Sequence, residues 1–142
     1  MKSSEQPERS HRSWLMSRVR SKNSQPELAL RRLVFSMGYR YRLHGAGLPG
    51  KPDLVFASRR KVIFMHGCFW HRHPGCKLAR MPKSRLEFWI PKLERNRERD
   101  LENLKALQAI GWKALVVWEC QVSKPDSLRG KLVRFLGPGG GK

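Results

Sequence analysis

Residues 66–76, which read His-Gly-Cys-Phe-Trp-His-Arg-His-Pro-Gly-Cys, constrain the fold of this chain more than any other segment. Three histidines, two cysteines and two large aromatic residues lie within these eleven positions. Imidazole and thiolate groups are ligands that suit zinc. A metal site built here would pin the segment to whatever part of the chain supplies a further ligand, so metal binding and folding would be linked.

Cys68, His73 and Cys76 have the short spacing of a structural zinc site. Cys120 follows a later predicted strand, from which it could return as the fourth ligand of a Cys3His set. The alternative is three ordinary buried cysteines, which are common in protein cores. The interleaved histidine and the Pro-Gly before Cys76 favour zinc, while the spacing leaves open which histidine binds. An odd number of cysteines argues against a disulfide framework.

The charge of the chain points to a polyanionic partner. Thirty lysine and arginine residues against eleven aspartate and glutamate residues give a formal net charge of +19. Self-repulsion at this charge destabilises a compact chain unless an anionic partner offsets it. Nucleic acid is favoured over a membrane surface, because no strongly amphipathic basic helix with a bulky apolar face is evident. A generally basic proteome or a ribosome-associated protein is the alternative.

The length of 142 residues fits one domain with a single moderate core. We predict a basic N-terminal arm at residues 1–23, a folded domain at residues 24–136 and a flexible tail at residues 137–142. No apolar run is long enough to span a bilayer, and the first residues lack the apolar segment of a secretory signal. The expected protein is therefore cytoplasmic and nucleoid-associated, with no membrane partner.

Apolar periodicity predicts an α/β sheet domain with at least three strands and with helices on the faces of the sheet. In order, the pattern predicts a helix at residues 24–38, a short strand at 39–44, a hairpin of strands at 53–56 and 61–65, a helix at 91–110, a strand at 112–118 and a helix at 126–136.

Two capping patterns, Ser24-Gln-Pro-Glu27 and Ser84-Arg-Leu-Glu87, mark predicted helix starts. Pro91 would break a continuous helix or begin a new one at its first turn. The helix after it is predicted to bury an apolar stripe made of Leu93, Leu101, Leu104, Leu107 and Ile110.

Asp53 stands at the start of the first hairpin strand, and the second strand runs out at Met65 and His66. A carboxylate at such a place can hold Mg²⁺, which needs only one or two carboxylates. If His73 binds zinc, His66 and His71 remain, and either could deprotonate a water that attacks a phosphodiester. The alternatives are a turn aspartate and histidines that contact phosphate or solvent.

Phe69 and Trp70 are adjacent aromatics in a polar loop, and Trp89 lies in another basic stretch. In a basic protein, exposed aromatic side chains can stack on bases or wedge between them. The alternative is a small hydrophobic cluster over the zinc site.

Lys92, Asn96 and Asp100 follow one another at i+4 spacing on one face of the long predicted helix. Lysine and asparagine can contact phosphates and base edges, and Asp100 could orient a histidine or a metal-bound water. A solvated charged face is the default interpretation of such a pattern.

Taken in order, these blocks resemble the very short patch repair endonucleases, a mismatch-specific branch of the PD-(D/E)xK nuclease superfamily. The resemblance runs from about Arg18 to Cys120 and rests on Leu-Pro-Gly-Lys-Pro-Asp53, Val-Ile-Phe-Met-His-Gly-Cys-Phe-Trp-His71, Glu-Phe-Trp89, Asn96-Arg-Glu-Arg-Asp100 and Val-Trp-Glu-Cys120. It implies a single restriction-endonuclease-like domain, with a central mixed β-sheet flanked by helices and a structural zinc site.

The resemblance implies an endodeoxyribonuclease of DNA mismatch repair that nicks one strand of double-stranded DNA next to the thymine of a T·G mispair. Catalytic Mg²⁺ and structural Zn²⁺ are the implied cofactors. We expect a monomer, with mismatch-repair proteins as further candidate partners. The alternatives are a related site-specific or mobile-element endonuclease, and a non-catalytic, zinc-stabilised DNA-binding module.

Carried over by position, the resemblance implies four groups of site residues. The Mg²⁺ ligands are Asp53 and the backbone carbonyl of Met65, and His71 is the general base, supported by His66 and Asp100. The structural zinc ligands are Cys68, His73, Cys76 and Cys120. The intercalating wedge is Phe69, Trp70 and Trp89, and the mismatch contacts are Lys92 and Asn96.

The chain departs from the family pattern at several positions. The second acidic residue and the lysine of the superfamily are missing after Ile63. Met65 stands where better-known members have a threonine, a change that is harmless if only the backbone carbonyl binds metal. The Cys76 spacing also differs between members. Glu27 matches an acidic position on the first helix, although its capping pattern explains it without catalysis.

Overall fold

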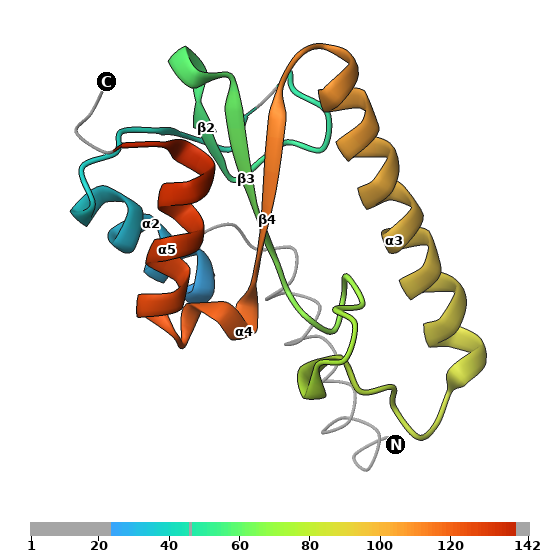
Figure 1. Ribbon diagram of the computed structural model, residues 1–142. Helices are drawn as coiled ribbons and strands as arrows, with labels where there is room; N and C mark the ends of the chain where they lie inside the picture. Colours follow the sequence, from blue (N-terminus) through green and yellow to red (C-terminus); the bar gives the residue numbers. More distant parts are fainter. Residues whose placement is uncertain (1–23, 46, 139–142) are drawn as a thin grey trace.

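The computed structural model describes residues 24–45 and 47–138 (Figure 1). The predicted basic arm and residues 139–142 of the predicted tail lie outside the described residues, so the proposed domain boundaries stay predictions. The elements follow the predicted order: α2 (Gln25–Ser36), β1 (Arg42–Leu43), β2 (Leu54–Phe56), the 3₁₀ turn η1 (Ala57–Arg59), β3 (Lys61–His66), the 3₁₀ turn η2 (Lys77–Ala79), α3 (Leu86–Ala109), β4 (Lys113–Trp118), α4 (Glu119–Val122) and α5 (Pro125–Leu136). None of the described helices is long and apolar enough to cross a membrane.

The four strands form one mixed sheet in the order β1-β2-β3-β4. β2 pairs antiparallel with both β1 and β3, as a hairpin requires. β3 and β4 are parallel, with His66 opposite Trp118 at their shared carboxyl end. A parallel pair needs a crossover connection, and α3 supplies it. The predicted mixed α/β fold is confirmed.

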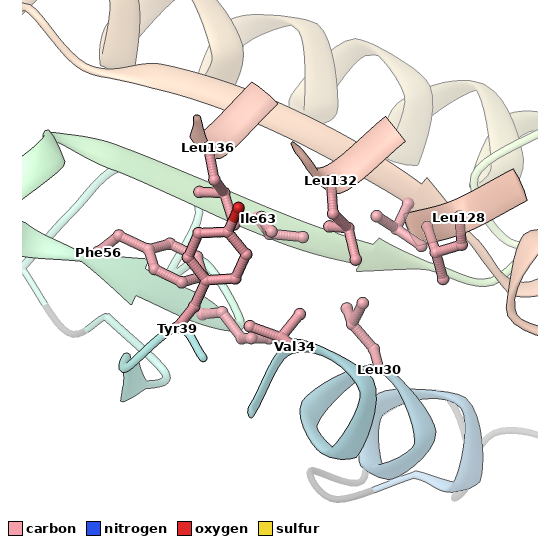
Figure 2. Close-up of a cluster of buried hydrophobic side chains, with 10 residues drawn as sticks. Leu30, Val34, Tyr39, Phe56, Ile63, Leu128, Leu132 and Leu136 are labelled. Atoms are coloured by element: carbon pink, nitrogen blue, oxygen red, sulfur yellow. The ribbon is translucent and has the colours of Figure 1, made fainter. Parts of the chain in front are cut away.

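Helices cover both faces of the sheet (Figure 1). Successive strand residues point to opposite faces. Leu54, Phe56 and Ile63 therefore join the large core beneath α2 and α5. In Figure 2 the leucines of α5 point toward Leu30 and Val34 of α2, with Ile63 of the sheet among them. On the opposite face, Val55, Val62 and Phe64 form a second cluster with Leu107 of α3.

The break or new start predicted at Pro91 is wrong, whereas the pattern Ser84-Arg-Leu-Glu87 does lie at the observed start, although no side-chain capping hydrogen bond forms there. α3 is one continuous helix that begins at Leu86 after Arg85, and it runs through Pro91 without a break. Pro91 is the sixth residue of the helix, so its ring removes only one hydrogen bond close to the N-terminal end. Trp89 and Leu93, on either side of it, are buried, and this packing offsets the loss.

The predicted apolar stripe of α3 is correct at Leu93, Leu104 and Leu107 but not at Leu101 or Ile110. Leu93 and Leu107 are buried, whereas Leu101 and Ile110 are 53% and 50% exposed. Leu93 packs in a cluster near the N-terminal end of the helix, and Leu107 packs on the sheet near its C-terminal end. Between these two contacts the helix faces a cleft, so the middle of α3 presents polar residues to the candidate site.

Candidate active site and metal cluster

A cleft of about 200 Å³ opens where the start of β2, the end of β3 and the middle of α3 meet. Five residues that the sequence proposed for catalysis line it: Asp53, Met65, His66, His71 and Asp100. Gly50, Lys51, Phe64, Asn103 and Leu104 complete the lining. The hairpin, the loop after it and the crossover helix thus bring together residues that are 47 positions apart in the chain (100 − 53).

Asp53 is held rigidly at the edge of the sheet. Its backbone N–H donates to the Ile63 carbonyl (3.1 Å), and its Oδ2 accepts the Met65 N–H at 2.6 Å. Burial raises the pKa of Asp53 to about 6, and the charge of Glu27 adds to this, although the Met65 N–H opposes it. A carboxylate that is costly to leave charged and unpaired is a good ligand for a hard cation such as Mg²⁺. The backbone, not the side chain, of Met65 makes the contact with Asp53.

His71 lies between a carboxylate and a second imidazole. Its Nδ1 is 2.5 Å from Asp100 Oδ2, and its ring stacks on that of His66 with centroids 3.8 Å apart and planes tilted by 7°. Burial lowers the pKa of His66 to about 3, and the nearby charge of His71 acts in the same direction, so His66 is neutral. With Nδ1 bonded to the carboxylate, Nε2 of His71 is the nitrogen left to accept a proton.

The side chain of Glu27 makes contacts that its capping pattern did not predict. Ser24 Oγ does accept the Glu27 N–H at 3.4 Å. The Glu27 carboxylate, however, is buried, contacts Arg31 and lies 2.8 Å from His44 Nε2. Ligand atoms of Glu27, His44 and Asp53 lie within 4.8 Å of one another, so this group adjoins the cleft. The capping interpretation therefore explains the backbone of Glu27 but not its side chain.

Cys68, His73, Cys76 and Cys120 converge as predicted, with one ligand atom from each within 4.8 Å of the others. Short turns bring the first three together, since His73 N–H donates to the Cys68 carbonyl (3.0 Å) and Cys76 N–H to that of His73 (3.4 Å). Cys120 lies on α4, directly after β4, and its Sγ is 3.5 Å from His73 Nδ1.

The donor set of this cluster fits a structural zinc ion. All three cysteines are free thiols, and three sulfurs with one imidazole nitrogen make a closed tetrahedral set. Burial raises the pKa of the Cys68 thiol to about 12, so a bound cation is needed to keep its thiolate in this environment. Trp118 stacks on the His73 ring at 4.2 Å, and Glu119 Oε1 accepts the Cys68 N–H at 3.4 Å.

The three aromatics that the sequence proposed as a wedge pack against one another. Ring centroids of Phe69, Trp70 and Trp89 are 5.2 to 5.6 Å apart, and Leu93 lies beneath them. Trp70 and Trp89 are buried and Phe69 is half-buried. The hydrophobic cluster that we considered as the alternative is therefore present in this structure. Asn96 donates to the Trp70 carbonyl at 3.3 Å, which ties α3 to the loop.

Comparison with known proteins places the chain in a family. The family model described as DNA mismatch endonuclease Vsr matches residues 5–77. The type II nicking enzyme V.XorIIP of Xanthomonas oryzae is 54% identical over 132 residues, which cover 93% of this chain and 95% of that protein. The chain belongs to the Vsr family.

Two further Vsr-family relatives extend the comparison. The DNA mismatch endonuclease Vsr of Escherichia coli is 41% identical over 117 residues, which cover 82% of this chain and 74% of that protein. The type II nicking enzyme V.NmeAIP of Neisseria meningitidis is 40% identical over 127 residues, which cover 89% and 90% of the two chains. As a Vsr-family member the chain is an endonuclease acting on DNA, which confirms the predicted enzyme class.

Some residues that line the cleft, or that contact Glu27 next to it, had no assigned role in the sequence analysis. Arg31 could have been found from its i+4 spacing to Glu27, which is the usual spacing of a helical ion pair. His44 carries no such signal, because only the pairing of β1 with β2 brings it to Glu27. Lys51 and Asn103 likewise reach the cleft through the turn before Asp53 and through the crossover helix.

Proposed function

We propose that this chain is a Mg²⁺-dependent endonuclease that nicks one DNA strand next to the thymine of a T·G mispair. The observation that carries the proposal is the His71–Asp100 pair, 2.5 Å apart, in the same cleft as the half-buried Asp53 carboxylate. Hydrolysis of a phosphodiester needs a base for the attacking water and a positive charge for the phosphate. The relatives, which are named as a mismatch endonuclease and as nicking enzymes, support the same function.

In this proposal His71 is the general base. Nε2 takes the proton of the attacking water, and the Asp100 carboxylate at Nδ1 stabilises the imidazolium that forms. His66 acts as a positioning residue, because its neutral ring covers one face of His71 without competing for the proton. Asp53 and the Met65 carbonyl would hold Mg²⁺, which when bound neutralises charge that develops on the phosphate.

Recognition of the mispair is assigned to the aromatic cluster and the adjoining face of α3. Phe69, Trp70 and Trp89 would enter the base stack, a step that costs least where pairing is already weak. Lys92 and Asn96 lie on the same helix face as Asp100, where they can reach base edges or phosphates. The Cys3His cluster supports this arrangement, because Phe69, Trp70 and His71 stand between its ligands Cys68 and His73.

The test is a nicking assay on end-labelled duplexes that differ only in one base, so that the same thymine faces either guanine or adenine. We expect one nick, in the thymine strand of the T·G duplex alone, with Mg²⁺ and not with EDTA. Equal nicking of both duplexes would refute the mismatch requirement. Absence of Mg²⁺-dependent nicking would refute the proposed activity as a whole.

A further inference from the structure

We infer that Lys51 is a catalytic residue whose ammonium group contacts the scissile phosphate and stabilises the charge that develops there. This inference rests on the proposed function and adds a residue to the same cleft. Three independent observations carry it: the charges that line the cleft, the backbone conformation of Lys51, and the packing of the turn that holds it.

The first observation is the charge of the cleft. Among the described residues that line it, Lys51 is the one lysine or arginine, although the whole chain carries thirty. Asp53 and Asp100 place their carboxylates in the lining of the same cleft. A phosphodiester adds one negative charge when it enters, and attack by water adds a second. A permanent cation in this position stabilises the negative charge that develops on the phosphate.

The second observation is backbone strain. Lys51 has φ of +49°, a left-handed conformation that residues with a Cβ rarely adopt because of steric crowding. Glycine would form the same turn without that crowding. The conformation is held because Lys51 N–H donates to the Leu48 carbonyl (3.0 Å) and Gly45 N–H to that of Pro52 (2.8 Å). Four other described non-glycine residues also have positive φ, so this conformation supports a function for the Lys51 side chain only together with its place in the lining of the cleft.

The third observation is that the turn containing Gly50 and Lys51 packs closely against α3. A Cβ placed on Gly50 would lie 3.0 Å from three side-chain atoms of Asn103, so any other residue there would have to displace Asn103 by a few tenths of an ångström. Asn103 is one helical turn beyond Asp100, the partner of His71. The turn that carries Lys51 is therefore fixed beside the catalytic pair. The Lys51 side chain is exposed, so a DNA backbone can reach it.

In the reaction, the water oxygen forms a bond to phosphorus as the ester P–O bond breaks. The water proton passes to His71 Nε2, and the leaving oxygen takes a proton from solvent. Lys51 transfers no proton in this step. Its ammonium donates hydrogen bonds to a non-bridging oxygen, and these strengthen as that oxygen gains charge.

The test compares Lys51→Gln and Lys51→Arg with a matched control, Lys105→Gln. Lys105 is an exposed lysine on α3, next to the lining residue Leu104 but not itself part of the cleft lining. Single-turnover nicking of the T·G duplex with enzyme in excess measures the chemical step. Affinity for the same duplex, measured without Mg²⁺, measures binding. Thermal melting of each variant checks that it is folded.

We expect Lys51→Gln to slow the chemical step by about 100-fold, the usual loss when one donor to a developing oxyanion is removed. Its affinity for DNA should fall no more than that of Lys105→Gln, and Lys51→Arg should recover most of the rate because it keeps the charge. A Lys51→Gln rate equal to that of the control would overturn the inference, as would a Lys51→Arg rate as low as that of Lys51→Gln. If the wild type itself does not nick the duplex, the proposed function is refuted, and the inference about Lys51 is refuted with it.

Discussion

At the scale of single residues, the proposed mechanism depends on the two groups that contact His71, the Asp100 carboxylate and the His66 ring. Asp100 holds Nδ1 and the neutral His66 ring covers one face, so the proton-accepting nitrogen has a defined direction. His66 and His71 could be proposed from sequence because both lie in one short segment. Their separate roles could not, since these follow from burial and from contacts with α3.

The Asp100 carboxylate should be needed for the chemical step and not for DNA binding. We expect Asp100→Asn to slow single-turnover nicking by between about 10² and 10⁴, because the amide cannot stabilise the imidazolium and leaves the wrong tautomer available. The matched control is Asp126→Asn, an exposed aspartate in the first turn of α5. Wild-type nicking by Asp100→Asn would remove the pair from the mechanism.

The raised pKa of Asp53 makes the stability of the Mg²⁺-free protein depend on pH. The folded chain keeps this proton up to about pH 6, whereas the unfolded chain loses it near pH 4. The contribution of Asp53 to folding is therefore fully present below pH 4 and is lost as pH rises through 6. Asp53→Asn should gain stability relative to the wild type over this range, by up to about 3 kcal/mol.

Urea unfolding of both proteins in Mg²⁺-free buffer between pH 4 and pH 7 measures this difference. Because the comparison is made at each pH, the opposite effect of His66, which destabilises the fold in acid, cancels between the two proteins. A difference that stays constant with pH would show that the folded and unfolded chains bind this proton equally.

At the scale of elements, the segment from Gly67 to Arg85 matters most, because it carries two of the three wedge candidates, the proposed base and three of the four proposed zinc ligands. Local spacing predicted its ligands, since the turn geometry of Cys68, His73 and Cys76 depends on neighbours in sequence. The break predicted at Pro91 was wrong because the helix there is stabilised by tertiary packing. Trp89 and Leu93 are buried on either side of Pro91, and that burial exists only after the loop has folded onto the helix.

Loss of one zinc ligand should damage this segment as a whole. We expect Cys76→Ser to lose bound zinc, to lower the free energy of unfolding by more than about 2 kcal/mol and to slow nicking, because His71 and the aromatics lose their support. His71→Ala is the matched comparison, and it should abolish nicking while zinc content and melting temperature stay at wild-type values. Metal analysis and thermal melting of the two purified variants measure this. Full zinc content in Cys76→Ser would contradict the assignment.

At the scale of the whole molecule, the sheet separates two functions. Helices α2 and α5 lie over one face and α3 lies over the other (Figure 1). The large core fills the space between the sheet and the first two helices, and residues of α3 line the cleft and contribute to the aromatic cluster. The mixed α/β class and the order of elements followed from apolar periodicity. The partner of each strand face did not, and neither did the meeting of Glu27 with His44, because both depend on contacts between distant segments.

The charge of +19 should make DNA affinity steeply dependent on salt. A protein that neutralises several phosphates loses about 10³ in affinity between 50 and 200 mM salt, because condensed counterions are released on binding. We expect this slope for T·G and T·A duplexes alike, so that the preference for the mispair changes little with salt. Titrations of both duplexes at several salt concentrations test this. A flat dependence would show that the basic surface does not lie on the DNA.

The central claim is that the cleft formed by β2, β3 and α3 performs metal-dependent hydrolysis of DNA. Single-turnover nicking of a T·G duplex by the wild type, Asp53→Asn and Asp126→Asn, with Mg²⁺ and with enzyme in excess, tests it most directly. We predict wild-type nicking by Asp126→Asn and at least about 100-fold slower nicking by Asp53→Asn, which should still bind the duplex. Nicking by Asp53→Asn at the wild-type rate would contradict the claim and place the chemistry elsewhere.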